Sequence, residues 1–252
     1  MDKYFDINES GCSIRSKLYC GRPDDVRRVV VFCHGFGGHK DNKAAETFAH
    51  RIIAKWKGTA VVTFDWPCHG EDARKHLSLV DCDTYLGIVV SYVQRRFQTD
   101  ELYAYGTSFG GFLLLKYLLD HGNPFRRIAL RCPAVDMLGT FMRVIATPDD
   151  LRKLEAGKTI LAGFDRKVKI DKSYLEELRA LDIQDREFFD YAESILILQG
   201  TADEVVSYET TAKFADDNAI EFVPVEGADH RFHDPKKMDM AIARIISFFE
   251  AA

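Results

Sequence analysis

The chain has 252 residues, of which 46% are hydrophobic, and its 34 Lys and Arg against 39 Asp and Glu give a formal net charge of −5. This length fits one α/β domain, or one domain with an insertion. The acidic balance argues against a nucleic-acid binder, whose footprint would be a basic patch. No apolar run approaches the roughly 20 residues of a membrane span, and the polar N-terminus lacks the apolar core of a signal peptide.

The six cysteines form neither C-x-x-C pairs nor a His/Cys cluster at zinc spacing. Free thiols in a reducing compartment explain this pattern, so we expect a cytoplasmic protein without a metal site. The sequence does not fix the oligomeric state, and a homodimer is compatible with it.

The first half of the chain alternates strands with helices. Residues 3–20 are typical of an antiparallel hairpin turning at Glu9-Ser10-Gly11. Arg28–Cys33 is a run of β-branched and aromatic residues, which indicates a strand covered on both faces, as in a parallel sheet. The elements expected next are a helix over Ala44–Lys57, a strand over Thr59–Asp65, a helix over Thr84–Phe97, a strand over Leu102–Tyr105, a helix to about Leu119 and a strand over Phe125–Arg131.

From about Val135 to Asp190 the alternation gives way to charged, irregular sequence. A long excursion of this kind in an α/β domain is usually a lid or a functional insertion. We therefore divide the chain into a core of residues 1–134 and 191–252 and an inserted cap of residues 135–190. Within the cap we expect short helices at Pro148–Leu154 and Ser173–Leu181, a Ser173-x-x-Glu176 capping box, and a hairpin of Thr159–Ala162 with Lys167–Ile170.

After the cap the alternation resumes. The expected elements are a strand at Ser194–Gln199, a helix over about Tyr208–Ala215, a strand at Ile220–Val225 and a helix at Met238–Phe249. Strands alternating with helices indicate a mostly parallel sheet with helices on both faces.

The strongest motif is Gly106-Thr107-Ser108-Phe109-Gly110, a G-x-S-x-G sequence between a short strand and an apolar helix. Its glycines remove Cβ atoms that would collide as the strand turns sharply into the helix. The turn exposes the Ser108 hydroxyl beside a helix N-terminus, where free N–H groups favour developing negative charge. The pattern predicts a nucleophile, and the alternative is an ordinary N-cap serine.

A serine nucleophile needs a base to take its proton and a carboxylate to orient that base. Asp203 follows the strand at Ser194–Gln199 and His230 follows the strand at Ile220–Val225, in the order that the motif requires. His233 is the rival base and Glu204 the rival acid.

Two further histidines, His34 and His69, lie in turns after strands. We expect them to brace these turns through hydrogen bonds to the backbone and not to take part in catalysis.

These motifs resemble those of the α/β-hydrolase superfamily, over nearly the whole chain. The resemblance rests on His34-Gly35-Phe36-Gly37-Gly38, on Asp65 to His69-Gly70, on Gly106 to Gly110 and on the loops of Asp203 and His230. Within the superfamily the chain is most similar to small carboxylesterases of the cinnamoyl and feruloyl esterase and monoacylglycerol lipase-like group. It departs from them at Cys68, where relatives usually have glycine.

The resemblance implies an α/β-hydrolase fold with Ser108 as nucleophile, Asp203 as orienting acid and His230 as general base. It implies an oxyanion hole formed by the backbone N–H groups of Phe36 and Phe109. The chemistry is acyl transfer to water and requires no cofactor. Four cap side chains are candidates for an apolar acyl pocket: Phe141, Met142, Phe164 and Tyr174.

We therefore predict a serine carboxylesterase acting on a small-molecule ester of a short-chain or aromatic (cinnamoyl- or feruloyl-like) acid. A long-chain interfacial lipase fits less well because the cap is charged. The alternatives are a thioesterase, a serine peptidase of the acylaminoacyl or prolyl type, and, outside enzymes, a ligand receptor on a hydrolase scaffold.

Overall fold

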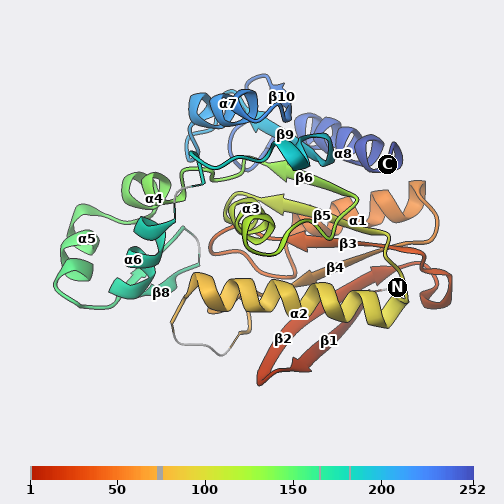
Figure 1. Ribbon diagram of the computed structural model, residues 1–252, viewed down its shortest axis with the longest axis horizontal. Coiled ribbons are helices and arrows are strands. Elements are labelled where there is room, and N and C mark those ends of the chain that lie inside the picture. Colours follow the sequence, from red (N-terminus) through yellow and green to blue (C-terminus); the bar gives the residue numbers. More distant parts are fainter. Residues whose placement is uncertain (1, 73–75, 165, 182) are drawn as a thin grey trace.

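An eight-stranded sheet forms the centre of the computed structural model, which describes residues 2–72, 76–164, 166–181 and 183–252 (Figure 1). In spatial order its strands are β1 (Asp2–Glu9), β2 (Cys12–Cys20), β4 (Thr59–Phe64), β3 (Arg28–Cys33), β5 (Leu102–Thr107), β6 (Arg127–Arg131), β9 (Ile195–Gly200) and β10 (Glu221–Val225). The pairs β1–β2 and β2–β4 are antiparallel, and all other neighbouring strands of this sheet are parallel. The predicted mostly parallel sheet is confirmed.

The N-terminal hairpin turns where the sequence predicts. Glu9 pairs with Cys12, so only Ser10 and Gly11 lie in the loop. Their φ angles are 50° and 74°. Positive φ at both central residues is the geometry of the two-residue turns whose twist matches that of the flanking strands.

Alternate residues of the middle strands supply two separate cores, one on each side of the sheet. In β3, Val29 and Val31 belong to one hydrophobic cluster, whereas Val30 and Phe32 belong to the other. This two-sided burial explains the unbroken apolar run of Arg28–Cys33.

Helices cover both faces, as predicted (Figure 1). The first cluster contains apolar residues of α2, α3 and α7, and the second contains those of α1 and α8. The bounds of these helices are α1 (Lys43–Lys55), α2 (Leu79–Phe97), α3 (Phe109–His121), α7 (Tyr208–Asp217) and α8 (Pro235–Glu250). Short 3₁₀ turns, η1 (Pro23–Asp25) and η3 (Phe189–Ser194), precede β3 and β9.

The described part of residues 135–190 contributes no strand to the main sheet and extends to one side of it, at the left of Figure 1. Their only strands among the described residues, β7 (Ile160–Ala162) and β8 (Val168–Ile170), form the predicted antiparallel hairpin. The helical elements of this segment are α4 (Met137–Thr140), the π-helical turn η2 (Phe141–Ile145), α5 (Pro148–Glu155) and α6 (Lys172–Ala180).

Helix α6 differs from the prediction at its start. Its N-cap is Asp171, whose carboxylate accepts from the Tyr174 N–H at 3.3 Å, so the capping box predicted at Ser173 is wrong. The Ser173 hydroxyl instead donates to the Asp171 carboxylate at 2.6 Å. A complete capping box occurs at α5, between Thr147 and Asp150.

Helix α2 begins at Leu79, five residues before the predicted Thr84. Ser78 caps it, and the Glu177 carboxylate of α6 accepts from the Ser78 hydroxyl at 2.9 Å and from the Leu79 N–H at 2.6 Å. A residue about a hundred positions away therefore completes the first turn of α2, which no local pattern in the sequence indicates.

In the part of the chain that the structure describes, no helix combines the length and apolarity needed to cross a bilayer.

The packing of α3 on β3 leaves no room for a side chain at Gly110, and this can be tested against a second helical glycine. A Cβ atom on Gly110 would lie 2.2 Å from the Cys33 carbonyl oxygen, whereas on Gly87 the nearest atom, of Tyr117, would be 3.9 Å away. We expect Gly110→Ala to lower the free energy of unfolding by roughly 2–3 kcal/mol, because α3 must move off the sheet. Gly87→Ala should raise it by about 0.5–1 kcal/mol.

Urea unfolding of the two variants and the wild-type protein measures both effects. A Gly110→Ala variant as stable as wild type would contradict the close approach of α3 to β3.

Candidate active site

Ser108 lies where β5 ends and α3 begins, with φ 51° and ψ −117°. A positive φ is uncommon outside glycine and is maintained only where the surrounding structure enforces it. The Ser108 N–H donates to the Arg131 carbonyl at 3.0 Å, and its own carbonyl accepts from the N–H groups of Gly111 and Phe112 at 2.9 and 3.1 Å. The side chain caps no amide of α3, so the N-cap alternative does not account for this serine.

The loops after β9 and β10 bring Asp203 and His230 together. The Nδ1 atom of His230 lies 3.0 and 2.9 Å from the two carboxylate oxygens of Asp203. Because a carboxylate only accepts, Nδ1 carries the proton, and Nε2 of the neutral ring is left as an acceptor.

The Asp203 carboxylate is fully buried, yet every contact it makes favours its charged form. Besides His230, it accepts from the N–H groups of Val205 and Val206, both at 2.9 Å, and from the Gln199 side-chain amide at 2.7 Å. Burial raises the pKa of Asp203, but these hydrogen bonds, led by that from His230, outweigh it and bring the pKa below the ordinary 3.8. Asp203 is therefore ionised at neutral pH.

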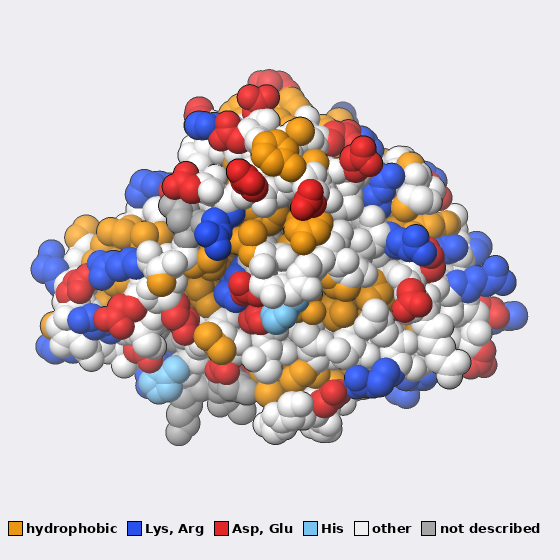
Figure 2. All heavy atoms as spheres, viewed as in Figure 1, with side chains coloured by type: hydrophobic (Ala, Val, Ile, Leu, Met, Phe, Trp, Pro, Cys, Tyr) orange, Lys and Arg blue, Asp and Glu red, His pale blue; other side chains and the backbone are white. Residues whose placement is uncertain are grey.

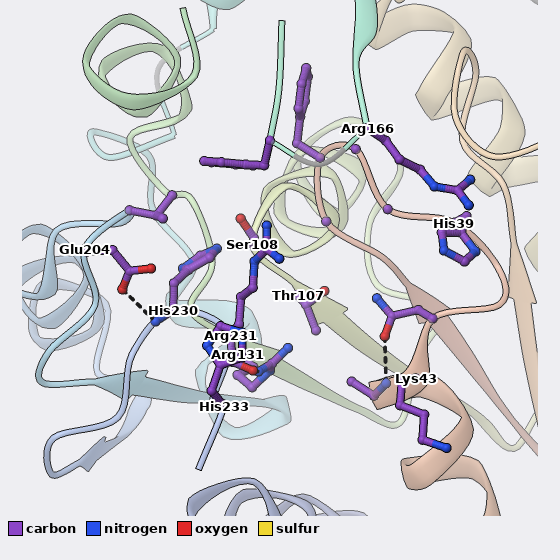
Figure 3. Close-up of a pocket in the computed structure, with 18 residues that line it drawn as sticks. His39, Lys43, Thr107, Ser108, Arg131, Arg166, Glu204, His230, Arg231 and His233 are labelled. Atoms are coloured by element: carbon purple, nitrogen blue, oxygen red, sulfur yellow. Dashed lines mark hydrogen bonds between the residues drawn. The ribbon is translucent and has the colours of Figure 1, made fainter. Parts of the chain in front are cut away.

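The rival base and acid are engaged elsewhere. The His233 ring pairs with Asp229 on the exposed side of the loop, and not with Asp203. Glu204 accepts from the backbone N–H of His230 at 3.1 Å, so it holds the loop and does not contact the ring (Figure 3). This geometry supports His230 as base and Asp203 as its orienting acid.

Two backbone amides near Ser108 are suited to bind an oxyanion. Phe109 is the first residue of α3, so its N–H has no partner within the helix. The loop after β3 approaches Ser108 so closely that a Cβ atom on Gly35 would lie 3.3 Å from the Ser108 Cβ. Within the described residues the Phe36 N–H makes no hydrogen bond. The rings of Phe36 and Phe109 pack edge to face, with centroids 5.6 Å apart, and fix the two segments against each other.

His34 and His69 brace turns, as the sequence predicts. Their Nδ1 atoms donate to the backbone carbonyls of Gly35 and Pro67, both at 2.8 Å. Burial lowers the pKa of both rings, to about 4 for His69 and well below the ordinary range for His34, so both are neutral at pH 7.

A single cavity of about 610 Å³ joins the predicted catalytic side chains Ser108 and His230 (Figure 3). Phe36 and Phe164 also line it. Its size is typical of sites that take small molecules.

The other three residues predicted to form an acyl pocket do not line this cavity, and the prediction is corrected for them. Phe141 and Tyr174 are completely buried and pack edge to face against each other, with centroids 5.7 Å apart. They belong to the same hydrophobic cluster as the apolar residues of α2 and α3. Met142, one residue further along η2, is 40% exposed at the surface.

Sequence reasoning missed three arginines that line the cavity, Arg131, Arg166 and Arg231. Arg131 is buried, and its guanidinium donates to the Arg231 carbonyl at 3.0 Å and lies over the Phe232 ring at 5.1 Å. Its position at the end of β6, the strand that neighbours β5, was a signal available in the sequence. Arg166 lies in the turn between β7 and β8, and no local signal identifies it.

One group of close Cys, carboxylate and His side chains lies at the site, Cys132, Asp203 and His230, and it does not fit a metal well. Burial raises the pKa of Cys132, which keeps the thiol protonated, and the Nδ1 atom of His230 is already bonded to Asp203.

Comparison with known proteins agrees with this description. A sequence profile of the alpha/beta hydrolase fold family matches residues 28–167. No protein of curated function matches the sequence at a significant level.

Several solved structures share the fold. Est1E from Butyrivibrio proteoclasticus, bound to ferulic acid, aligns with a TM-score of 0.79 at 17% identity over 98% of both chains. Alpha/beta hydrolase domain-containing protein 10 from mouse aligns at 0.74 and 14% identity over 99% of both chains. The monoacylglycerol lipase of Paleococcus ferrophilus aligns at 0.67 and 17% identity, over 95% of this chain and 99% of the lipase. At these identities the similarity establishes a common fold.

The low pKa of Asp203 predicts a specific pH dependence of stability. A carboxyl whose pKa is lower in the folded than in the unfolded state stabilises the fold above its unfolded pKa, and this contribution is lost as pH falls through the folded pKa. We expect Asp203→Asn to be destabilised relative to wild type at neutral pH, and the difference to shrink as pH falls below about 4. Urea unfolding of both proteins across pH measures it, with Asp185→Asn as a control at a residue outside the site. A difference that is constant with pH would contradict the assigned ionisation.

Proposed function

The chain belongs to the α/β-hydrolase family, and from its site we propose that it is a serine hydrolase that cleaves carboxylic esters of short-chain or aromatic acids. The observation that carries this proposal is the hydrogen bond between the buried Asp203 and His230, whose ring lines the same cavity as Ser108 at the end of β5. We also propose that residues 135–190 act as a cap over this cavity.

In the proposed mechanism the Ser108 hydroxyl attacks the acyl carbon of the ester and gives its proton to Nε2 of His230. Nε2 is the acceptor because Nδ1 donates to Asp203. The ionised Asp203 holds the ring in this tautomer and stabilises the imidazolium that forms. The negative charge that develops on the carbonyl oxygen is bound by the Phe36 and Phe109 amides.

The tetrahedral intermediate then collapses. His230 returns the proton to the leaving oxygen, the alcohol departs, and the acyl group remains on Ser108 as an ester. A water molecule, deprotonated in turn by His230, attacks this acyl-enzyme and releases the acid. Ser108, His230 and the ionised Asp203 therefore account for each proton transfer of this mechanism.

The residues that line the cavity favour a substrate with a small acyl group. Phe36 and Phe164 provide aromatic walls near Ser108. The known binding of ferulic acid by the structurally similar Est1E is consistent with an aromatic acyl group. The visible face of residues 135–190 mixes Lys, Arg, Asp and Glu with scattered hydrophobic side chains (Figure 2), which does not favour a lipase acting at a lipid surface.

Replacement of Ser108 tests the mechanism. We expect Ser108→Ala to lower kcat/KM on p-nitrophenyl acetate by at least about 10³-fold and to abolish labelling by a fluorophosphonate probe. Ser13→Ala, at an exposed serine of β2, is the matched control and should change neither. Full activity of Ser108→Ala would exclude the proposed nucleophile. Thioesters and aminoacyl amides assayed alongside distinguish thioesterase and peptidase activity.

Replacement of Phe164 tests the acyl pocket. We expect Phe164→Ala to lower the preference for methyl ferulate or p-nitrophenyl benzoate over p-nitrophenyl acetate by about tenfold, because an aromatic wall of the cavity is lost. Phe189→Ala, at a phenylalanine that is 56% exposed away from the cavity, is the control. An unchanged preference in Phe164→Ala would remove this residue from the binding site.

A further inference from the structure

The turn between β7 and β8 packs directly on the loop after β3, and it forms part of the cavity wall. A Cβ atom on Gly163 would lie 2.6 Å from the Arg166 carbonyl oxygen and 3.3 Å from the ring of Phe36. A Cβ atom on Gly37 would lie 3.0 Å from the same carbonyl oxygen. Phe164 and Arg166 of this turn line the same cavity as Ser108.

The described residues that line the cavity carry an excess of positive charge (Figure 3). The permanently positive side chains among them are Lys43, Arg131, Arg166 and Arg231. The one carboxylate among them is Glu204, and it already accepts from the His230 N–H. Arg131 and Arg231 are engaged by contacts within the protein, the first with the Arg231 carbonyl and the second with the Phe164 ring, so Lys43 and Arg166 are the cations that would attract an anion.

Arg166 is the cation that is most available to a ligand. Among the described residues no carboxylate pairs with it. Among the described residues the Lys43 ammonium pairs with Glu46, at 3.4 Å and with its own side chain 88% exposed, so this pair holds it weakly.

His39 lies beside Arg166 at the same end of the cavity (Figure 3). Its Nδ1 accepts from the Asp41 N–H at 3.2 Å. Burial, and next the charge of Arg166, lower the pKa of His39, so the ring is neutral at pH 7 and carries its proton on Nε2. Nε2 is therefore a hydrogen-bond donor.

These groups lie on the acyl side of the proposed reaction. His230 must reach both the Ser108 oxygen and the leaving oxygen, so the leaving group lies toward His230 and the acyl group away from it. In Figure 3, His39, Lys43 and Arg166 lie on the opposite side of Ser108 from His230 and Glu204.

We propose that the acyl part of the substrate carries a carboxylate, so that the substrate class is the monoester of a dicarboxylic acid. Arg166 and Lys43 bind this carboxylate and His39 donates a hydrogen bond to it. The proposal rests on the proposed esterase function and adds the substrate class to it.

Two pairs of matched esters test whether the substrate carries a carboxylate and whether that carboxylate lies on the acyl side. One pair is p-nitrophenyl hydrogen adipate and p-nitrophenyl methyl adipate, which differ only in an anion on the acyl side. The other is 4-acetoxybenzoate and its methyl ester, which differ in an anion on the leaving group. We expect wild type to prefer the adipate acid over its methyl ester by about tenfold in kcat/KM, mainly through KM, and to show no such preference in the second pair.

Substitutions of single residues test which side chains cause the preference for the adipate acid. Arg166→Gln and Lys43→Gln should each reduce it about three- to tenfold, and about 1 M salt should weaken it in wild type because exposed charges are screened. Arg152→Gln removes an arginine from α5 whose side chain is 72% exposed, and it should leave the preference unchanged.

The possible outcomes distinguish failure of the proposed acyl carboxylate from failure of the proposed serine esterase function. Equal or better cleavage of the methyl adipate overturns the proposed carboxylate but leaves the serine esterase intact. A charge preference confined to 4-acetoxybenzoate, or one that survives both substitutions, overturns the assigned position. Calorimetric binding of monomethyl adipate to Ser108→Ala gives a readout independent of turnover, and binding that does not weaken in Ser108→Ala/Arg166→Gln also overturns it.

Discussion

The site depends on the backbone conformation of Ser108. Its positive φ costs about 1–3 kcal/mol, which the neighbouring structure must supply. Backbone hydrogen bonds from β6 and α3 hold it in place, and α3 can begin at once only because Gly110 lets the helix pack onto the Cys33 carbonyl. The same contacts that make the sheet and its helices close-packed therefore direct the hydroxyl into the cavity.

A second constraint acts on the charge of Asp203. A carboxylate without exposure would take up a proton if it were left unpartnered. Three donors besides His230 prevent this, and two of them are consecutive amides of its own loop, Val205 and Val206. The short loop after β9 thus stabilises the negative charge of Asp203 with its own backbone amides. No buried cation is needed for Asp203 to remain ionised beside His230.

The sequence predicts the parts of this protein that depend on local pattern. Strand-end position was enough to bring Asp203 near His230, because carboxyl ends of parallel strands meet at one edge of a sheet. Local sequence patterns did not predict features that depend on contacts between residues far apart in the sequence. The first turn of α2 depends on Glu177, Arg166 reaches the cavity only through the packing of its turn on Gly37, and the aromatic residues Phe141 and Tyr174 fill an interior that no periodicity revealed.

In the proposed mechanism, chemistry and selectivity come from different parts of the chain. Ser108, Asp203 and His230 are held by the main sheet, whereas Phe164 and Arg166 belong to a hairpin whose strands pair only with each other. If the proposed function is right, a substitution in that hairpin should alter which acyl group is bound without disturbing the hydrogen bonds that hold Asp203 and His230. Because the hairpin places an aromatic ring and a cation two residues apart over one cavity, a change in its turn shifts apolar and charged recognition together. We therefore expect acyl selectivity in this chain to follow the residues of the turn and not those of the sheet.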